Sequence, residues 1–138
     1  ALKRGGGLEI QSFEKLLPEA EAAMLATAHL DDVSSYDVAW AANVVRQAWQ
    51  RLHEVFRAEG KAPLLAELKP FVAGGMTTPP KQEEVAARLG VPIATLRTWL
   101  SRLRQQYRDV LRAEVARTVS DPADVDEELH YLYRILMS

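Results

Sequence analysis

The chain has 138 residues, contains no cysteine and carries a formal net charge of −2 at pH 7. This length suffices for one domain with a hydrophobic core, or for a compact domain with an arm, and the absence of cysteine excludes a disulfide framework and thiolate metal sites. No apolar run approaches the length that spans a bilayer, so we expect a cytoplasmic protein that does not contact a membrane.

The first part of the chain is glycine-rich and then helical in composition. Three consecutive glycines at positions 5–7 cannot hold a helix or a packed strand, so residues 1–12 are predicted to be a linker or an extended arm. Residues 13–75 are predicted to form an N-terminal helical segment. Within it, Phe13 to Leu30 is alanine-rich, and Pro18 is expected to begin a helix rather than to break one.

A strong helix start follows at Ser34, which can cap the helix, while the acidic Asp37 suits both the capping geometry and the helix dipole. A shorter helix is predicted from Ala62 to Ala73, with Pro70 in its last turn and two glycines after it. In the longer helix that starts at Ser34, apolar residues recur every three or four positions until Gly60 ends the pattern. They are Tyr36, Trp40, Val44, Ala48, Leu52, Val55 and Phe56.

The segment from Gln82 to Ser101 has the pattern of a helix-turn-helix. It reads as a short helix stopped by Gly90, a Val91-Pro92 turn and a second helix from Ile93. Gly90 can take the left-handed conformation that reverses the chain, and Ala86 is small enough for the second helix to approach the first. An ordinary corner between two helices is the alternative. The apolar positions of the motif are occupied by Val85, Leu89, Val91, Leu96 and Trp99.

The rest of the chain is predicted to be helical too. The loop before the motif offers Thr78 or a neighbour as a helix cap, and the helix from Ile93 shows no stop signal before Ser120. Asp121-Pro122 is a cap followed by proline at a first helical position, so a final amphipathic helix is expected. Residues 76–138 would then form a helix-turn-helix DNA-binding domain with a C-terminal helix. Because no segment reads convincingly as a strand, the predicted fold class is all-α.

The small net charge hides an asymmetry along the chain. Residues 81–117 contain eight basic and four acidic residues, a charge of +4. Residues 118–138 contain five acidic and one basic residue, and residues 8–59 contain nine acidic and four basic, giving −4 and −5. Positive potential is therefore expected around the helix-turn-helix, where it would attract the phosphate backbone of DNA.

The second helix of the motif carries the predicted DNA contacts. Its inward positions are Leu96, Trp99, Leu100 and Leu103. On its outward face, arginine can read a guanine edge with two hydrogen bonds, threonine and serine can bond to bases or phosphate, and alanine can approach a thymine methyl. Further along, Arg104 and Arg108 are expected to meet phosphate where the helix leaves the groove. The candidate site is Ala94, Arg97, Thr98, Ser101, Arg102, Arg104 and Arg108.

Nothing in the sequence points to enzyme chemistry, a metal site or a cofactor. The histidines, at positions 29, 53 and 130, are far apart, and none stands in a ligand-spaced pair. The acidic residues after Ser120 lack the turn glycine of a calcium loop, and helix capping explains most of them. The glycines at positions 5–7 follow no strand and so form no phosphate loop. We therefore expect a protein that is not an enzyme.

The segment from Thr95 to Arg104, with Glu83 to Ala86 and Leu89 to Pro92 before it, resembles region four of bacterial sigma factors of the extracytoplasmic-function class. In these proteins region four recognises the upstream promoter element in the major groove and binds the β flap of RNA polymerase. Region two, which melts the downstream element, would precede Lys3 and is absent from this sequence. The resemblance therefore implies a C-terminal part of a sigma factor, or a chain without its melting half. Three further segments resemble one subgroup of the class: Leu68–Phe71, Arg112–Asp126 and Lys3–Gly7.

The resemblance implies double-stranded promoter DNA and the RNA polymerase core as partners, and it leaves open whether an anti-sigma factor is a third. Two other functions stay open from the residues alone. One is a self-contained regulator that dimerises through its N-terminal helices, and the other is a protein-interaction domain that keeps the helix-turn-helix only as a scaffold. Because the sequence has no heptad run of charges and no strand edge for a symmetric partner, we expect a monomer.

Overall fold

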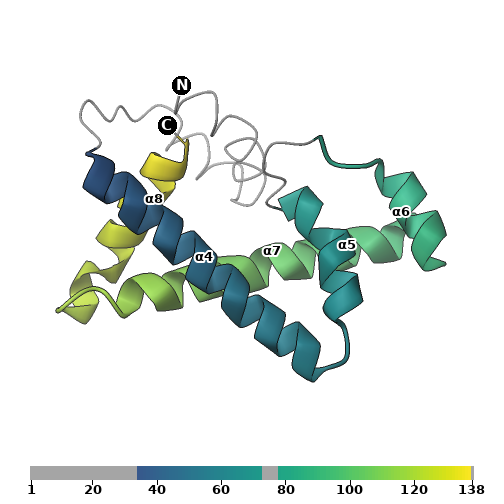
Figure 1. Cartoon of the computed structure of the whole chain (residues 1–138), viewed down its shortest axis with the longest axis horizontal. Coiled ribbons are helices and arrows are strands. Elements are labelled where there is room, and N and C mark those ends of the chain that lie inside the picture. The colour runs from purple at the N-terminus through teal and green to yellow at the C-terminus, as the bar shows by residue number, and fades with distance from the viewer. Residues whose placement is uncertain (1–33, 73–77, 138) are drawn as a thin grey trace.

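The computed structural model describes residues 34–72 and 78–137. These residues form helices and no strand, which confirms the all-α fold class for the described part of the chain (Figure 1). The predicted arm at 1–12 and the predicted helix between Phe13 and Leu30 lie outside the described residues. The elements are α4 (Ser35–Ala58), α5 (Ala62–Val72), α6 (Gln82–Leu89), α7 (Ile93–Ala116), the short 3-10 helix η1 (Pro122–Asp124) and α8 (Val125–Met137).

Helix α4 begins and ends where its local signals predict. The Ser34 hydroxyl accepts a hydrogen bond from the Asp37 N–H at 3.1 Å, which satisfies one of the free donors of the first turn. At the other end, Gly60 has a φ of 71°, a conformation that costs glycine little. The chain then turns into α5, which includes Pro70 near its end. Both predicted helices are therefore confirmed.

The buried face of α4 is narrower than its apolar spacing suggested. Its buried residues are Ala41, Val44, Ala48, Trp49, Leu52 and Phe56. Tyr36 and Val55, which were predicted to belong to this face, are instead 80% and 47% exposed. The prediction is wrong for these two, which lie in the first and last turns of α4, while α4 crosses α7 at an angle (Figure 1). Phe56, also in the last turn, is buried, so the position around the helix as well as along it sets the exposure.

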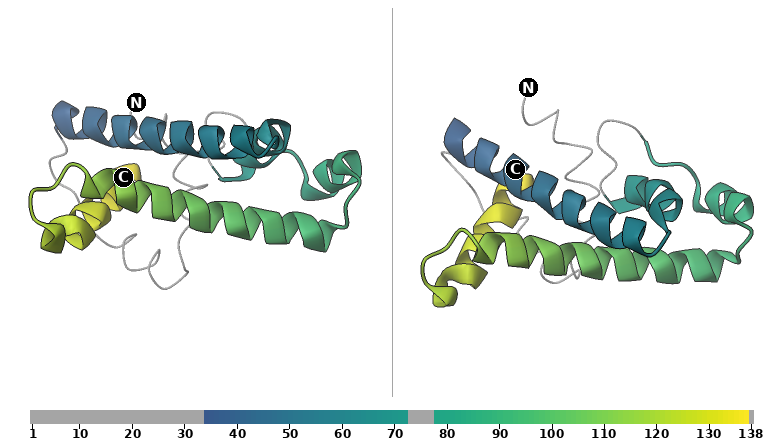
Figure 2. Two further views of the ribbon diagram at one scale, coloured as in Figure 1. Left: turned by 90° about the horizontal axis from the view of Figure 1, so that it is seen from below. Right: turned by 60° about the horizontal axis from the view of Figure 1, so that its bottom comes forward.

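Helix α7 is the element around which the others pack. It contacts α4, α5, α6 and α8, and α4 crosses it at an angle, as the right-hand view of Figure 2 shows. Its buried stripe recurs every three or four residues, as expected for one face of a helix. The stripe joins residues from α4, α5, α6 and α8 in a single hydrophobic core. Helices on both sides of the predicted boundary between residues 75 and 76 share this core, and the boundary itself stays a prediction. The stripe consists of Leu96, Leu100, Leu103, Tyr107, Leu111 and Val115.

Side-chain hydrogen bonds cap η1 and connect α8 to α4. The Asp121 carboxylate accepts a hydrogen bond from the Ala123 N–H at 3.0 Å, which confirms the predicted cap before Pro122. In α8 itself, the Tyr131 hydroxyl donates a 2.6 Å hydrogen bond to Asp37 at the start of α4. This hydrogen bond to a carboxylate holds the pKa of Tyr131 above its ordinary value, because it favours the protonated phenol. The first turn of α4 and the middle of α8 are thereby tied together.

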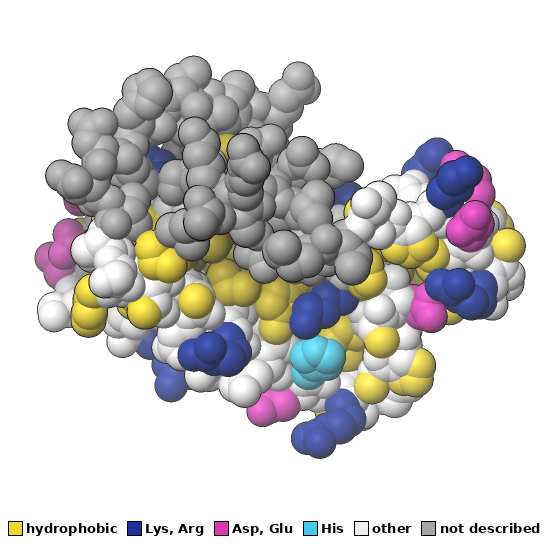
Figure 3. Space-filling view, turned by 45° about the horizontal axis from the view of Figure 1, so that its top comes forward, with side chains coloured by type: hydrophobic (Ala, Val, Ile, Leu, Met, Phe, Trp, Pro, Cys, Tyr) yellow, Lys and Arg dark blue, Asp and Glu magenta, His cyan; other side chains and the backbone are white. Residues whose placement is uncertain are grey.

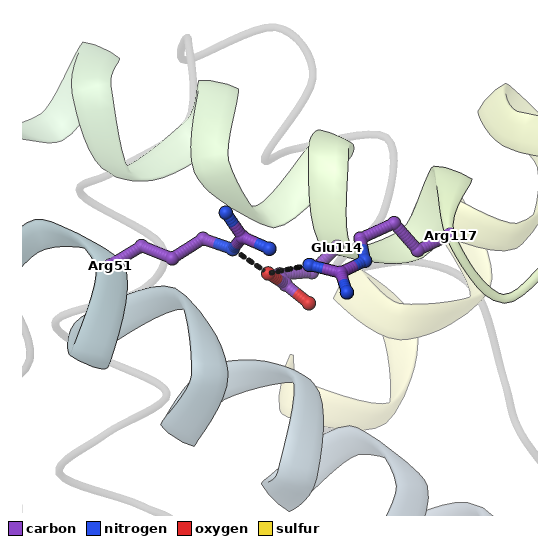
Figure 4. Close-up of polar contacts among 3 residues, drawn as sticks. All are labelled: Arg51, Glu114 and Arg117. Atoms are coloured by element: carbon purple, nitrogen blue, oxygen red, sulfur yellow. Dashed lines mark hydrogen bonds and ion pairs between the residues drawn. The ribbon is translucent and has the colours of Figure 1, made fainter.

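One buried carboxylate links α4 to α7. Glu114 in α7 is 7% exposed and is the only charged residue classed as buried in the described part of the chain. Arg51 from α4 donates a hydrogen bond to the Glu114 carboxylate, and the Arg117 guanidinium lies 3.7 Å from the same oxygen (Figure 4). A carboxylate removed from water needs such partners, since its burial alone is unfavourable. The three residues form a polar connection beside the hydrophobic core.

Candidate nucleic-acid interface

Helices α6 and α7 are joined by a tight turn at Gly90. The glycine has a φ of 72° and a ψ of 33°, which confirms the left-handed conformation predicted for it. Its N–H donates to the Ala87 carbonyl at 3.1 Å, and the Val91 N–H donates to the Ala86 carbonyl at 3.0 Å. These two bonds are those of a Schellman motif, which satisfies carbonyl groups at the end of a helix. Pro92 follows and occupies the N-cap position of α7.

The apolar residues of this segment pack as a two-helix corner on the core. Val85, Ala86 and Leu96 are buried, and Leu89 and Val91 pack against the core at its edge. Trp99 was predicted to be buried and is only half-buried. The reason is its place on α7, where it lies at the margin of the stripe that runs through Leu96, Leu100 and Leu103.

The start of α6 differs from the prediction. Thr78 or a neighbour was expected to cap this helix, but the N-cap position is occupied by Lys81, whose side chain makes no capping bond. A capping side chain reaches the N–H two or three residues further on, and Thr78 is too far from Gln82 to do so. Pro79, Pro80 and Lys81 lie between Thr78 and the first residue of α6. The acidic Glu83 and Glu84 in the first turn provide the favourable interaction with the helix dipole instead.

Five of the seven predicted contact residues are exposed on the first turns of α7. Two of them make polar contacts on the surface: the Arg97 Nε donates to the Gln82 side-chain oxygen Oε1 at 3.2 Å, and the Thr98 hydroxyl donates to the Ala94 backbone carbonyl at 3.1 Å. The structure thus brings these residues together at one end of α7, beside α6. The five are Ala94, Arg97, Thr98, Ser101 and Arg102.

The two remaining predicted contacts are less accessible. Arg108 is half-buried and donates a hydrogen bond to Gln105. Arg104 is also half-buried, and its Nε is a buried donor with no hydrogen-bond partner among the residues that the structure describes. Burial lowers the pKa of the Arg104 guanidinium, although arginine remains charged in proteins. Contacts of Arg104 and Arg108 with phosphate stay predictions.

The positive charge around α7 is partly balanced within the fold. Arg88 of α6 pairs with Glu67 of α5 at 2.5 Å, and Arg112 pairs with Asp126 of α8 at the same distance. Arg117 lies beside Glu114, as described above. Figure 3 shows the result near α6, where basic and acidic side chains are neighbours on the surface. Glu114 is already included in the sequence count of +4, but Glu67 and Asp126 lie outside residues 81–117, so that count overstates the positive charge that an approaching polyanion would meet.

The conformation of Gly90 leads to a stability prediction. We expect Gly90→Val to lower the free energy of unfolding by about 1–3 kcal/mol, because a β-branched residue is disfavoured at positive φ. A Cβ at this position would meet no atom within 4 Å, so the backbone and not a clash causes the loss. Urea unfolding should show this loss for Gly90→Val and a much smaller one for Gly90→Asn, since asparagine tolerates the left-handed region. Equal losses for the two variants would contradict the explanation.

The sequence did not predict Gln82 as the partner of Arg97, or Glu67 as the partner of Arg88. Gln82 bonds to Arg97 and Glu67 pairs with Arg88, and each pair joins different helices.

Within the ranges that the structure describes, no group of histidine or acidic residues could hold a metal ion. None of the described helices has the length and apolar character needed to cross a membrane. No protein-family model, curated protein or solved structure matches the chain.

Proposed function

We propose that α6, the turn at Gly90 and α7 form a helix-turn-helix that recognises the upstream promoter element as part of an alternative sigma factor. In this role α7 lies in the major groove, and the domain docks on the β flap of the RNA polymerase core to initiate transcription. The observation that carries the proposal is the group of exposed side chains on the first turns of α7, next to a short helix and a tight glycine turn. The sequence resemblance to region four adds support.

Each exposed side chain has a chemical use in the major groove. Arg97 and Arg102 can each donate two hydrogen bonds to the O6 and N7 acceptors of guanine. Thr98 and Ser101 can bond to a base or a phosphate, and Ala94 can contact a thymine methyl. The rest of the domain fixes the orientation of α7, because α4, α5 and α8 pack on its opposite face.

A second function is favoured by one observation, the pairing of basic residues on α6 and in the C-terminal part of α7 with carboxylates. Arg88, Arg112 and Arg117 are placed beside carboxylates of the same chain, and so contribute little net attraction for DNA. A protein-interaction domain that keeps the two-helix corner as a scaffold would need no stronger positive surface. A stand-alone regulator, the third alternative, would need a dimer to read a palindrome.

We expect alanine at Arg97 or Arg102 to weaken promoter binding by about 1–3 kcal/mol and to relax the preference at one base pair. Arg108→Ala should instead weaken all sequences alike and reduce the slope of log affinity against log salt by about one. The measurement is promoter binding by a holoenzyme reconstituted from RNA polymerase core and the full-length protein. The polymerase is needed because it holds the domain near the DNA and raises its effective concentration.

The matched control is Arg112→Ala, since Arg112 is an exposed arginine on the same helix that pairs with Asp126. It should leave both affinity and sequence preference near those of the unaltered protein. Wild-type affinity and preference for both Arg97→Ala and Arg102→Ala would remove the recognition role from α7. The scaffold function would then take its place.

A further inference from the structure

The hydrogen bond between Gln82 and Arg97 is a tertiary contact on the candidate DNA surface. Gln82 is the first residue of α6, and Arg97 lies on the first turns of α7, fifteen positions later in the chain. The Arg97 Nε donates to the Gln82 side-chain oxygen at 3.2 Å. Because arginine has donors only, the glutamine must present its oxygen to Arg97, and its amide NH₂ group is directed elsewhere.

This bond restricts the way in which Arg97 can be used. A guanidinium has five N–H donors in a planar fork, and a contact can use either its side, through Nε, or its end, through the two terminal nitrogens. The Nε is occupied by Gln82, so the end of the fork remains for a ligand. Two parallel acceptors at that spacing are offered by the O6 and N7 atoms of guanine.

We propose that Gln82 is a positioning residue that orients Arg97 for guanine and thereby sets the sequence preference at one base pair. The inference rests on the proposed function, because it requires α7 to lie in the major groove. Gln82 acts through Arg97 on the base. Its amide NH₂, at the start of α6, is left to donate to the DNA backbone, which is a sequence-independent contact.

The size of the effect follows from side-chain entropy. Holding a long side chain in one orientation costs roughly 0.5–1.5 kcal/mol when it occurs on binding, equivalent to about a twofold to twelvefold change in affinity. A bond already present in the free protein removes part of this cost. Loss of Gln82 should therefore reduce the preference for guanine over other bases by about twofold to tenfold.

The test compares three variants of Gln82 in the reconstituted holoenzyme, on promoters that differ at one base pair. Gln82→Met keeps the length of the side chain and removes the acceptor, so it should reduce the guanine preference. Gln82→Glu keeps an acceptor for Arg97 and replaces the amide donor with a negative charge. It should preserve the preference while lowering affinity for all sequences alike. In Gln82→Met combined with Arg97→Ala, the preference should equal that of Arg97→Ala alone.

Gln106→Met is the matched control, because Gln106 is an exposed glutamine on α7. It should bind with wild-type affinity and preference, and the melting temperatures of all these variants should stay close to the wild-type value. If Arg97→Ala loses the guanine preference and Gln82→Met retains it, the positioning role is wrong and the proposed function stands. If Arg97→Ala and Arg102→Ala both retain it, the proposed function fails and the positioning role fails with it.

Discussion

Leu100→Ala is expected to lower the free energy of unfolding by about 2–5 kcal/mol. Leu100 has no exposed surface and lies in the middle of the α7 stripe, where the core joins residues from five helices. Truncation there removes buried methyl groups and leaves a cavity that neighbouring helices can close only in part. For a protein of this size the loss is a large part of the total stability, so the variant should unfold at a clearly lower urea concentration.

The neighbours of Leu100 provide the controls for this prediction. Ser101→Ala, one residue further on the exposed face, should change stability by no more than about 0.5 kcal/mol. Trp99→Ala should fall between the two, because Trp99 is half-buried at the margin of the stripe. A larger loss for Ser101→Ala than for Leu100→Ala would show that α7 presents a different face to the core.

The ion pair between Arg51 and Glu114 should respond unequally to the loss of either partner. Arg51→Met leaves a carboxylate whose side chain is 9% exposed, and its remaining ion-pair partner among the described residues is Arg117, at 3.7 Å. An uncompensated buried charge costs about 3–5 kcal/mol, and since Arg117 compensates in part, we expect a loss of about 2 kcal/mol. Glu114→Met leaves two arginines whose side chains are 46% and 63% exposed, so water can solvate them. Its expected loss is below about 1 kcal/mol.

Urea unfolding of the two variants and of the double variant measures this difference. The double variant should resemble Glu114→Met, because once the carboxylate is gone Arg51 has no buried charge to compensate (Figure 4). A greater loss for Glu114→Met than for Arg51→Met would show that the pair stabilises the fold by more than the desolvation of the carboxylate costs. The explanation in terms of an unpaired buried charge would then be wrong.

For the part of the chain that the structure describes, the sequence by itself determined the class of the fold, the positions of the helices and the turn between α6 and α7. The Ser34 cap, the left-handed Gly90 and the Asp121 cap before η1 are all found where they were predicted. Each depends on atoms within a few residues of one another, so its signal is present in a short stretch of sequence. The buried stripe of α7 was predictable for a similar reason, because helical periodicity fixes which residues share a face.

Only the tertiary structure decided which of these residues are accessible and what they contact. The half-burial of Trp99 and Arg104 depends on how α7 meets its neighbours, and the exposure of Tyr36 depends on the angle at which α4 crosses it. The Arg88–Glu67 pair and the Gln82–Arg97 hydrogen bond join residues on different helices. Such contacts arise from the relative placement of whole helices, and a charge count or a periodicity along the chain contains no information about that placement.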